Sequence, residues 1–195
     1  MPVDDALAGA TTTIAESLRR DGTLFVAGNG GSFADALHVA GELAKNFERD
    51  RPLPPALRAR LLERPGREQL ADQLQAGLRV IVLGSNPVLT SAVDNDLALR
   101  HLGLAQELGG LGRPDDVLLA ISTSGASRNL INAAAIAHAI GMTVIALTGP
   151  SESELSGCSD IVIRAAGSST AEIQAAHVEQ YHDLCRGIER AMFPK

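Results

Sequence analysis

Short apolar segments alternate along the chain with segments of helical periodicity, and this alternation is the strongest constraint on the fold. The apolar segments are nearly continuous, as in LRVIVL (78–83), VLLAIS (117–122) and MTVIALT (142–148). A strand that is apolar along its whole length is buried on both faces, which is typical of a parallel sheet covered by helices. The pattern therefore predicts an α/β fold, a three-layer αβα sandwich with a parallel, flavodoxin-like sheet and right-handed crossovers.

The same periodicities predict where the elements lie. We expect strands at 23–27, 78–83, 117–122, 142–148 and 160–164, and helices at 3–20, 32–47, 130–140, 152–156 and 169–192. A further helical pattern after Asn95 and Asp96 runs from Leu99 to Leu108. A charged, proline-rich stretch, here termed the excursion (residues 51–77), predicts one or two short surface helices. We interpret residues 1–195 as one domain.

Composition excludes several classes of function. A net charge of −6 and a pI near 5.3 argue against a nucleic-acid-binding surface. No apolar run approaches the length of a membrane span, and the acidic N-terminus lacks the basic region of a secretory signal, so we expect a cytoplasmic protein that does not contact a membrane. Cys158 and Cys185 make no disulfide framework. The sequence also matches no nucleotide-binding motif: Phe33 replaces the third glycine of the dinucleotide motif G-x-G-x-x-G, and no P-loop sequence occurs.

The segment from Thr23 to Phe47 combines a glycine turn with a helix that carries His38 and Glu42. The turn, GNGGS at 28–32, leaves backbone N–H groups free at a helix start, where an anion such as phosphate binds. His38 and Glu42 are four residues apart on one helical face, a spacing suited to metal ligation or proton transfer. A plain strand–helix connection and an ordinary solvated pair are the alternatives.

A second candidate for anion binding is STSGAS at 122–127, where four hydroxyls surround one glycine at the end of a strand. Hydroxyls and the free N–H groups of the following helix bind phosphate without needing Lys or Arg. The alternative is an N-cap with polar turn residues, but a cap needs only one hydroxyl. We therefore favour phosphate binding by Ser122, Thr123, Ser124 and Ser127.

The last helix carries Gln174 and His182, with His177 between them. Gln174 and His182 are eight residues apart, just over two turns, so they share a broad helical face. For each histidine taken alone, a packed or half-exposed imidazole is the alternative to a functional role. The helix start is marked by the capping-box sequence of Ser169 and Glu172.

Taken together, these motifs resemble those of a SIS (sugar isomerase) domain: GNGGS, the helix with His38 and Glu42, STSGAS ahead of a helix, and IQ-x-x-H with a further histidine. More specifically, the chain is similar to the phosphoheptose isomerases, which interconvert sedoheptulose 7-phosphate and a heptose 7-phosphate. The resemblance covers nearly the whole chain, with the motifs in family order. It implies the SIS fold, an aldose–ketose isomerase that uses Zn²⁺, and a homotetramer with active sites between subunits.

The resemblance also implies roles for individual residues. The implied substrate and phosphate contacts are Asn29, Gly30, Gly31, Ser32, Asn95, Asp96, Ser122, Thr123, Ser124, Ser127 and Gln174. The implied zinc ligands are His38, Glu42, Gln174 and His182, with Gln174 exchangeable in favour of substrate. Glu42 and His182 are in addition the implied acid and base, and the sequence does not say which is which.

The chain departs from the family pattern in three places. Ala171 and Glu172 stand where an acidic residue and Arg often occur, Asn46 stands where a basic residue can occur, and the excursion is roughly twenty residues longer than usual. The exact sugar is therefore open, and another phosphosugar is an alternative substrate. Two non-enzymatic alternatives are a tetrameric SIS protein that associates with the replication initiator, and a phosphosugar-sensing regulator, which would need a DNA-binding domain. The combined ligand set favours the enzyme.

Overall fold

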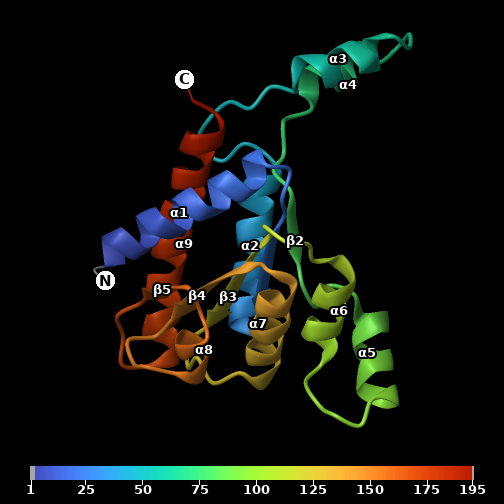
Figure 1. The fold of residues 1–195 in the computed structure, drawn as a ribbon. Helices are drawn as coiled ribbons and strands as arrows, with labels where there is room; N and C mark the ends of the chain where they lie inside the picture. Colours follow the sequence, from blue (N-terminus) through green and yellow to red (C-terminus); the bar gives the residue numbers. More distant parts are fainter. Residues whose placement is uncertain (1–2, 195) are drawn as a thin grey trace.

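Helices and strands alternate around one parallel sheet in the computed structural model, which describes residues 3–194 (Figure 1). The elements are α1 (Val3–Arg19), β1 (Leu24–Gly28), α2 (Gly31–Ala44), α3 (Pro55–Leu62), α4 (Glu68–Gln73), β2 (Val80–Val82), α5 (Pro87–Asp96), α6 (Gly103–Leu111), β3 (Val117–Ser122), α7 (Arg128–Ile140), β4 (Thr143–Thr148), α8 (Glu154–Gly157), β5 (Ile161–Arg164) and α9 (Thr170–Met192). Within the described range, no helix combines the length and the apolar character that a membrane crossing needs.

The strands are ordered β2-β1-β3-β4-β5 and every neighbouring pair is parallel. This is the flavodoxin-like order of a doubly wound sheet. The parallel α/β prediction is therefore confirmed.

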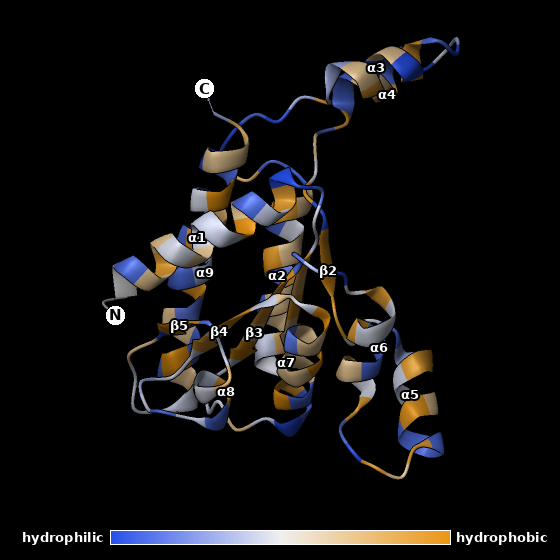
Figure 2. Ribbon diagram, viewed as in Figure 1, coloured by the Kyte–Doolittle hydropathy of each residue, from blue (hydrophilic) through white to orange (hydrophobic). Residues whose placement is uncertain are grey.

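The sheet is buried on both faces, which explains why its strands are apolar throughout (Figure 2). Along β1, Leu24 and Val26 join a core formed with α1, α2 and α9, whereas Phe25 and Ala27 join the opposite core. That second core is formed with α6, α7 and α8. Alternate side chains of one strand point to opposite faces, so both faces are apolar and the three layers follow.

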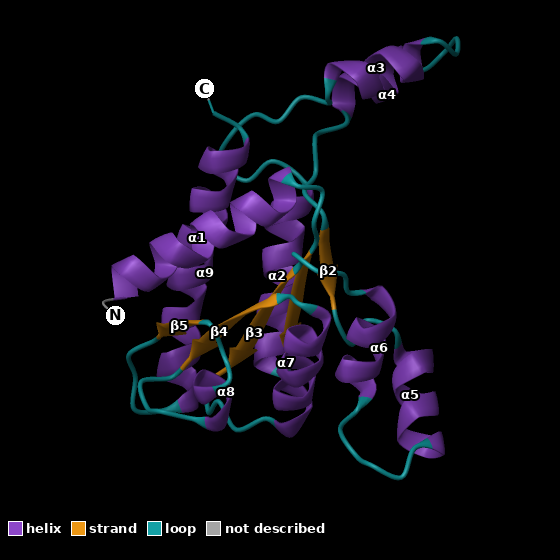
Figure 3. Ribbon diagram, viewed as in Figure 1, coloured by secondary structure: helices purple, strands orange, loops and turns teal. Residues whose placement is uncertain are grey.

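Most expected elements occur within a few residues of their expected positions, but one helix was missed (Figure 3). Residues 87–96 form α5, which begins with Pro87 behind an N-cap, where the side chain of Asn86 accepts the N–H of Leu89 at 3.1 Å. The helical pattern expected from Leu99 was too long, because α6 begins only at Gly103 and Leu99 is 67% exposed. The local signal for this helix was an asparagine at the N-cap, Asn86, followed directly by a proline at the first helical position, Pro87.

The start of α9 differs from the expected capping box in one bond. Ser169 is the N-cap and its side chain accepts the N–H of Glu172 at 3.3 Å, as predicted. The carboxylate of Glu172, however, accepts from the backbone N–H of Ser168 at 2.7 Å. The reciprocal bond is therefore displaced by one residue, and it still satisfies a backbone donor ahead of the helix.

The excursion projects away from the sheet as a pair of short helices (Figure 1). The two ends of the excursion, here termed its root, meet where the N–H of Ala76 donates to the carbonyl of Arg51 at 2.7 Å. Beyond the root, α3 buries no residue and α4 buries only Ala71. Four leucines remain between 38% and 46% exposed: Leu57, Leu62, Leu70 and Leu74. The prediction of one or two short surface helices is therefore confirmed, with two present, and they add little to the core.

Deleting the tip of the excursion should leave the sheet folded. Replacing residues 55–73 with a short Gly-Ser linker keeps the root residues Leu53 and Ala76, which are buried. We expect far-UV circular dichroism and the unfolding midpoint to match the parent, while KM or the oligomeric state changes, because periodic exposed leucines suit docking. Light scattering and initial-rate kinetics measure the outcome. A variant identical to the parent in both respects would leave the excursion without a role in assembly or substrate access.

Candidate active site

The two predicted anion-binding loops lie side by side at the carboxyl edge of the sheet. The glycine turn follows β1 and the STSGAS loop follows β3, and these strands are neighbours. The strand order reverses between β1 and β3, and ligands of open α/β sheets bind at such a switch point. Both loops line one cavity of about 280 Å³, formed by Asn29, Gly31, Ser32, Ile121, Ser122, Thr123, Ser124, Ser127, Thr170 and Gln174.

The hydroxyls of this cavity are not consumed by helix capping. Ser127 is the N-cap of α7, but its side chain makes no cap hydrogen bond, and the N-cap of α2 is Gly30, which has no side chain. The Oγ atoms of Ser122 and Ser127 lie 3.3 Å apart. Gly125 permits the loop, because its φ is +61° and a Cβ there would collide with Ser153. The Oγ atoms of Ser122 and Ser124 accept the N–H groups of Gly125 and Ala126, so their O–H groups can still donate. Two helix N-termini therefore meet hydroxyls that can donate to a ligand, an arrangement that suits an anion.

A pair of amides joins the glycine turn to the first turn of α7. Nδ2 of Asn29 donates to Oδ1 of Asn129 at 3.0 Å, and Nδ2 of Asn129 donates to Oδ1 of Asn29 at 2.8 Å. Both residues line a second cavity of about 340 Å³, which also includes Gly30, Asp94 and His101 among its lining residues. The carboxylate that reaches this cavity is thus Asp94.

The predicted substrate pair Asn95 and Asp96 is at the exposed end of α5. Nδ2 of Asn95 donates to Oδ1 of Asp96 at 2.8 Å. Neither residue lines the two cavities described above. Their role in substrate binding stays a prediction.

Removing hydroxyls from the STSGAS loop should weaken anion binding. Ser124→Ala and Thr123→Val each delete one donor to a charged group, a loss of about 1.5–3 kcal/mol, or roughly 10- to 100-fold in affinity. Calorimetry with inorganic phosphate measures the effect, and zinc content should not change. Ser91→Ala, on α5, is the matched control. Unchanged phosphate affinity in both loop variants would refute the assignment.

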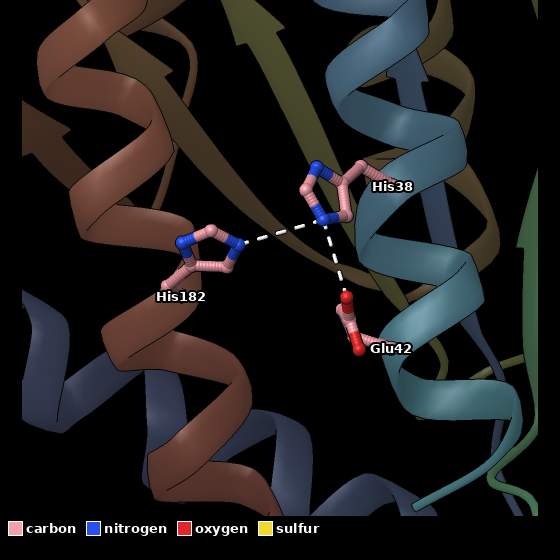
Figure 4. Close-up of side chains that lie close together, drawn as sticks. All are labelled: His38, Glu42 and His182. Atoms are coloured by element: carbon pink, nitrogen blue, oxygen red, sulfur yellow. Dashed lines mark hydrogen bonds and ion pairs between the residues drawn. The ribbon is translucent and has the colours of Figure 1, made fainter. Parts of the chain in front are cut away.

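His38, Glu42 and His182 form a second cluster at the facing surfaces of α2 and α9 (Figure 4). Nε2 of His38 lies 3.2 Å from Oε1 of Glu42 and 3.5 Å from Nε2 of His182. One ligand atom from each residue lies within 4.8 Å of the others, as a shared metal ion requires. The side chain of His38 is 44% exposed and that of Glu42 is 19% exposed, so a substrate can reach the cluster.

Two aromatic residues hold the imidazoles of this cluster. The hydroxyl of Tyr181 lies 2.9 Å from Nδ1 of His38, so Nε2 is the nitrogen that faces Glu42. Burial, with smaller contributions from neighbouring carboxylates and Cys185, raises the pKa of Tyr181 to about 12, which keeps the hydroxyl neutral. The ring of Phe47 stacks on His182 with centroids 5.6 Å apart. Such contacts orient metal-binding or proton-transferring imidazoles.

The other polar residues of α9 are distributed differently. Gln174 lines the anion cavity beside Gly31, where a Cβ would collide with its amide nitrogen. Its implied role as a zinc ligand stays a prediction. His177 is 0% exposed, and burial lowers its pKa; neither ring nitrogen has a hydrogen-bond partner among the described residues. His177 is therefore the packed histidine of the helix, and His182 is the one that reaches the cluster.

Sequence reasoning missed several residues around these sites. Asp94 and Thr90 are four apart on α5 and line the second cavity, but the helix itself was not expected. Phe47 and Tyr181 lie within the helices expected at 32–47 and 169–192, yet nothing in their spacing marks them as contacts of imidazoles. The partnership of Asn29 with Asn129 joins residues a hundred positions apart, which no local pattern reveals.

Comparison with known proteins gives consistent matches. The SIS domain family model matches residues 3–66 and 79–149. A phosphoheptose isomerase of Alteromonas mediterranea is 35% identical over 188 residues, which cover 95% of this chain and 82% of the relative. A solved phosphoheptose isomerase from Francisella tularensis has a TM-score of 0.77 at 32% identity, covering 95% of this chain and 86% of its own. One from Neisseria gonorrhoeae has a TM-score of 0.76 at 28% identity, covering 96% and 87%.

Proposed function

The chain belongs to the SIS domain family and, within it, to the phosphoheptose isomerases, and on this premise we propose that it interconverts D-sedoheptulose 7-phosphate and a D-glycero-heptose 7-phosphate. It is an aldose–ketose isomerase with a sugar phosphate as substrate. The observation that carries the proposal is the convergence of His38, Glu42 and His182 on one point of the surface between α2 and α9. A carboxylate and an imidazole that face each other are the groups that move a proton between neighbouring carbons.

Glu42 and His182 act as the acid and base of the proposed reaction. One group takes the proton from the carbon beside the carbonyl, which produces an enediol, and the other returns a proton one carbon away. Tyr181 holds the ring of His38 through Nδ1, and Phe47 stacks on the ring of His182. These contacts restrict the imidazoles before substrate arrives, which reduces the reorganisation needed during proton transfer.

The cluster also fits a zinc ion. Two imidazole nitrogens and a carboxylate oxygen form a usual catalytic zinc set, and here they lie within 4.8 Å of one another. We propose His38, Glu42 and His182 as ligands. Gln174 is two helical turns from His182 and lines the anion cavity in this structure, so its proposed role as a fourth, exchangeable ligand needs its side chain to turn toward the cluster. A bound Zn²⁺ supplies Lewis-acid polarisation of the carbonyl and stabilises negative charge on the enediolate. The tautomer of His38 needed for ligation through Nε2 is the one in which Nδ1–H donates to the hydroxyl of Tyr181.

The phosphate group of the substrate is assigned to the cavity of the STSGAS loop. Gln174 lines that cavity and His182 belongs to the acid–base cluster, and eight residues of α9 separate them, about 12 Å along the helix axis. This separation is of the order of the length of an extended seven-carbon sugar phosphate. The spacing along one helix therefore supports a substrate with its phosphate at the far end from the reacting carbons.

Direct assay tests the proposal. Pure protein incubated with sedoheptulose 7-phosphate should produce the aldose phosphate, observed by NMR. Production of an aldose only from another phosphosugar would change the substrate and keep the reaction class. A protein that binds sugar phosphates tightly but turns over none of them would be a binding module instead. The proposal also includes a homotetramer in the cytoplasm, and light scattering of the purified protein measures the subunit number.

A further inference from the structure

A fully buried ion pair joins the segment after α2 to α9, near the acid–base cluster. Nε of Arg51 donates to Oε1 of Glu189 at 2.7 Å, and the two side chains are 0% and 1% exposed. Burial raises the pKa of Glu189, but backbone N–H donors and Arg51 outweigh this effect and hold the pKa below its ordinary value. Because burying two charges costs free energy of desolvation, such a pair rarely adds net stability and points to another role.

Arg51 caps the C-terminus of α2, the helix that carries Glu42. Its Nη1 donates to the carbonyl of Leu43 at 2.9 Å, and its Nη2 donates to the carbonyl of Glu42 at 3.3 Å. Carbonyls in the last turn of a helix have no partner within the helix. The last turn of α2 contains no basic residue of its own. Lys45, the exposed C-cap residue, lies 4.0 Å from Oε2 of Glu42. Arg51 therefore adds a buried positive charge at the negative end of α2 and contacts the backbone of Glu42 itself.

Glu189 organises the backbone that follows α2. Its carboxylate accepts from the N–H groups of Phe47 at 2.9 Å, Glu48 at 2.9 Å and Arg49 at 3.0 Å. Phe47, held in this way, is the residue that stacks on His182. Glu189 also follows His182 by seven residues on α9, so both lie on one face of that helix. Through Phe47, the ion pair therefore also supports the position of the His182 imidazole.

We propose that Arg51 and Glu189 are positioning residues that lock α2 to α9 and hold Glu42 and His182 opposite each other. The inference rests on the proposed function of Glu42 and His182, and it assigns the pair no contact with substrate. The lock lies at the root of the excursion, because the carbonyl of Arg51 accepts from Ala76.

Two variants separate positioning from folding. Arg51→Met/Glu189→Leu replaces the pair with apolar side chains of similar size, which avoids an unpaired buried charge. Arg51→Lys keeps the charge beside Glu189, but its single ammonium cannot reproduce the spaced donors that contact Glu42 and Leu43. Arg58→Met/Asp72→Leu removes an exposed ion pair on the excursion and is the matched control.

Chelator competition measures the affinity for zinc, and NMR of the imidazoles measures the positions of His38 and His182. In both test variants, the affinity for zinc should fall about 10- to 100-fold, the usual effect of losing support behind metal ligands. Binding of inorganic phosphate should stay at the parent value, because the anion cavity lies at the other end of α9. In metal-free protein, the ¹⁵N signals of His38 and His182 should shift or broaden, while the signal of buried His177 should not.

The outcomes distinguish this inference from the proposed function. If the parent binds no zinc, the proposed metal is wrong, and the imidazole signals still decide whether the pair positions the cluster. A folded test variant with the parent's zinc affinity and imidazole signals would overturn the inference and leave the proposed function intact. Unfolding of both test variants would assign the pair to folding alone and would equally overturn the positioning role.

Discussion

Replacing Glu42 by Gln should abolish nearly all isomerase turnover while the protein stays folded. Glutamine keeps the size of the side chain but can neither accept nor return a proton at neutral pH, and removal of one acid–base group costs about 10²- to 10⁴-fold in rate. The proposed second role of Glu42 as a zinc ligand places the loss at the upper end of that range. The side chain is 19% exposed and belongs to neither hydrophobic core, so substitution should not unfold the chain. His182→Gln is expected to behave similarly.

Initial rates with sedoheptulose 7-phosphate and thermal unfolding together measure this effect. Glu179→Gln makes the same chemical change at an exposed position of α9 and should retain the parent's rate. Phosphate affinity should also be unchanged in Glu42→Gln, because the carboxylate is not part of the STSGAS cavity. Turnover within a few-fold of the parent in Glu42→Gln would exclude this carboxylate as acid or base.

Removal of zinc is expected to have the next largest effect. We expect about one zinc ion per chain, in line with one site built from His38, Glu42, His182 and Gln174. Treatment with a chelator should lower turnover by at least about a hundredfold, since Lewis-acid stabilisation is worth several kcal/mol in the transition state. Adding zinc back should restore the rate.

Elemental analysis of parent and variants checks the metal assignment. His182→Gln should lower the zinc content, whereas His138→Gln should not, because the imidazole of His138 lies elsewhere, 3.1 Å from the carboxylate of Asp160. Full activity in a thoroughly metal-free preparation would refute the zinc role and leave Glu42 and His182 as a plain acid and base.

The fold was predictable because its signals are local. Continuous apolar strands can only be buried on both faces, and this requires a parallel sheet with helices on either side. The family was predictable for a similar reason, since each motif is contained in a short segment. The excursion was recognisable from its prolines and charges. By contrast, α5 was missed because its start depends on one asparagine cap and a proline.

The sequence by itself determined which residue types the candidate site offers: a glycine turn, a hydroxyl loop, and helices with His38, Glu42 and His182. Only the tertiary structure decided which of them meet. His182 and His177 have equivalent helical signals, and packing buries His177 while His182 reaches His38. The Arg51–Glu189 pair and the Phe47 stack depend on where α9 crosses the end of α2. Such contacts join residues far apart in the chain, so they arise from the packing of layers and leave no local periodicity.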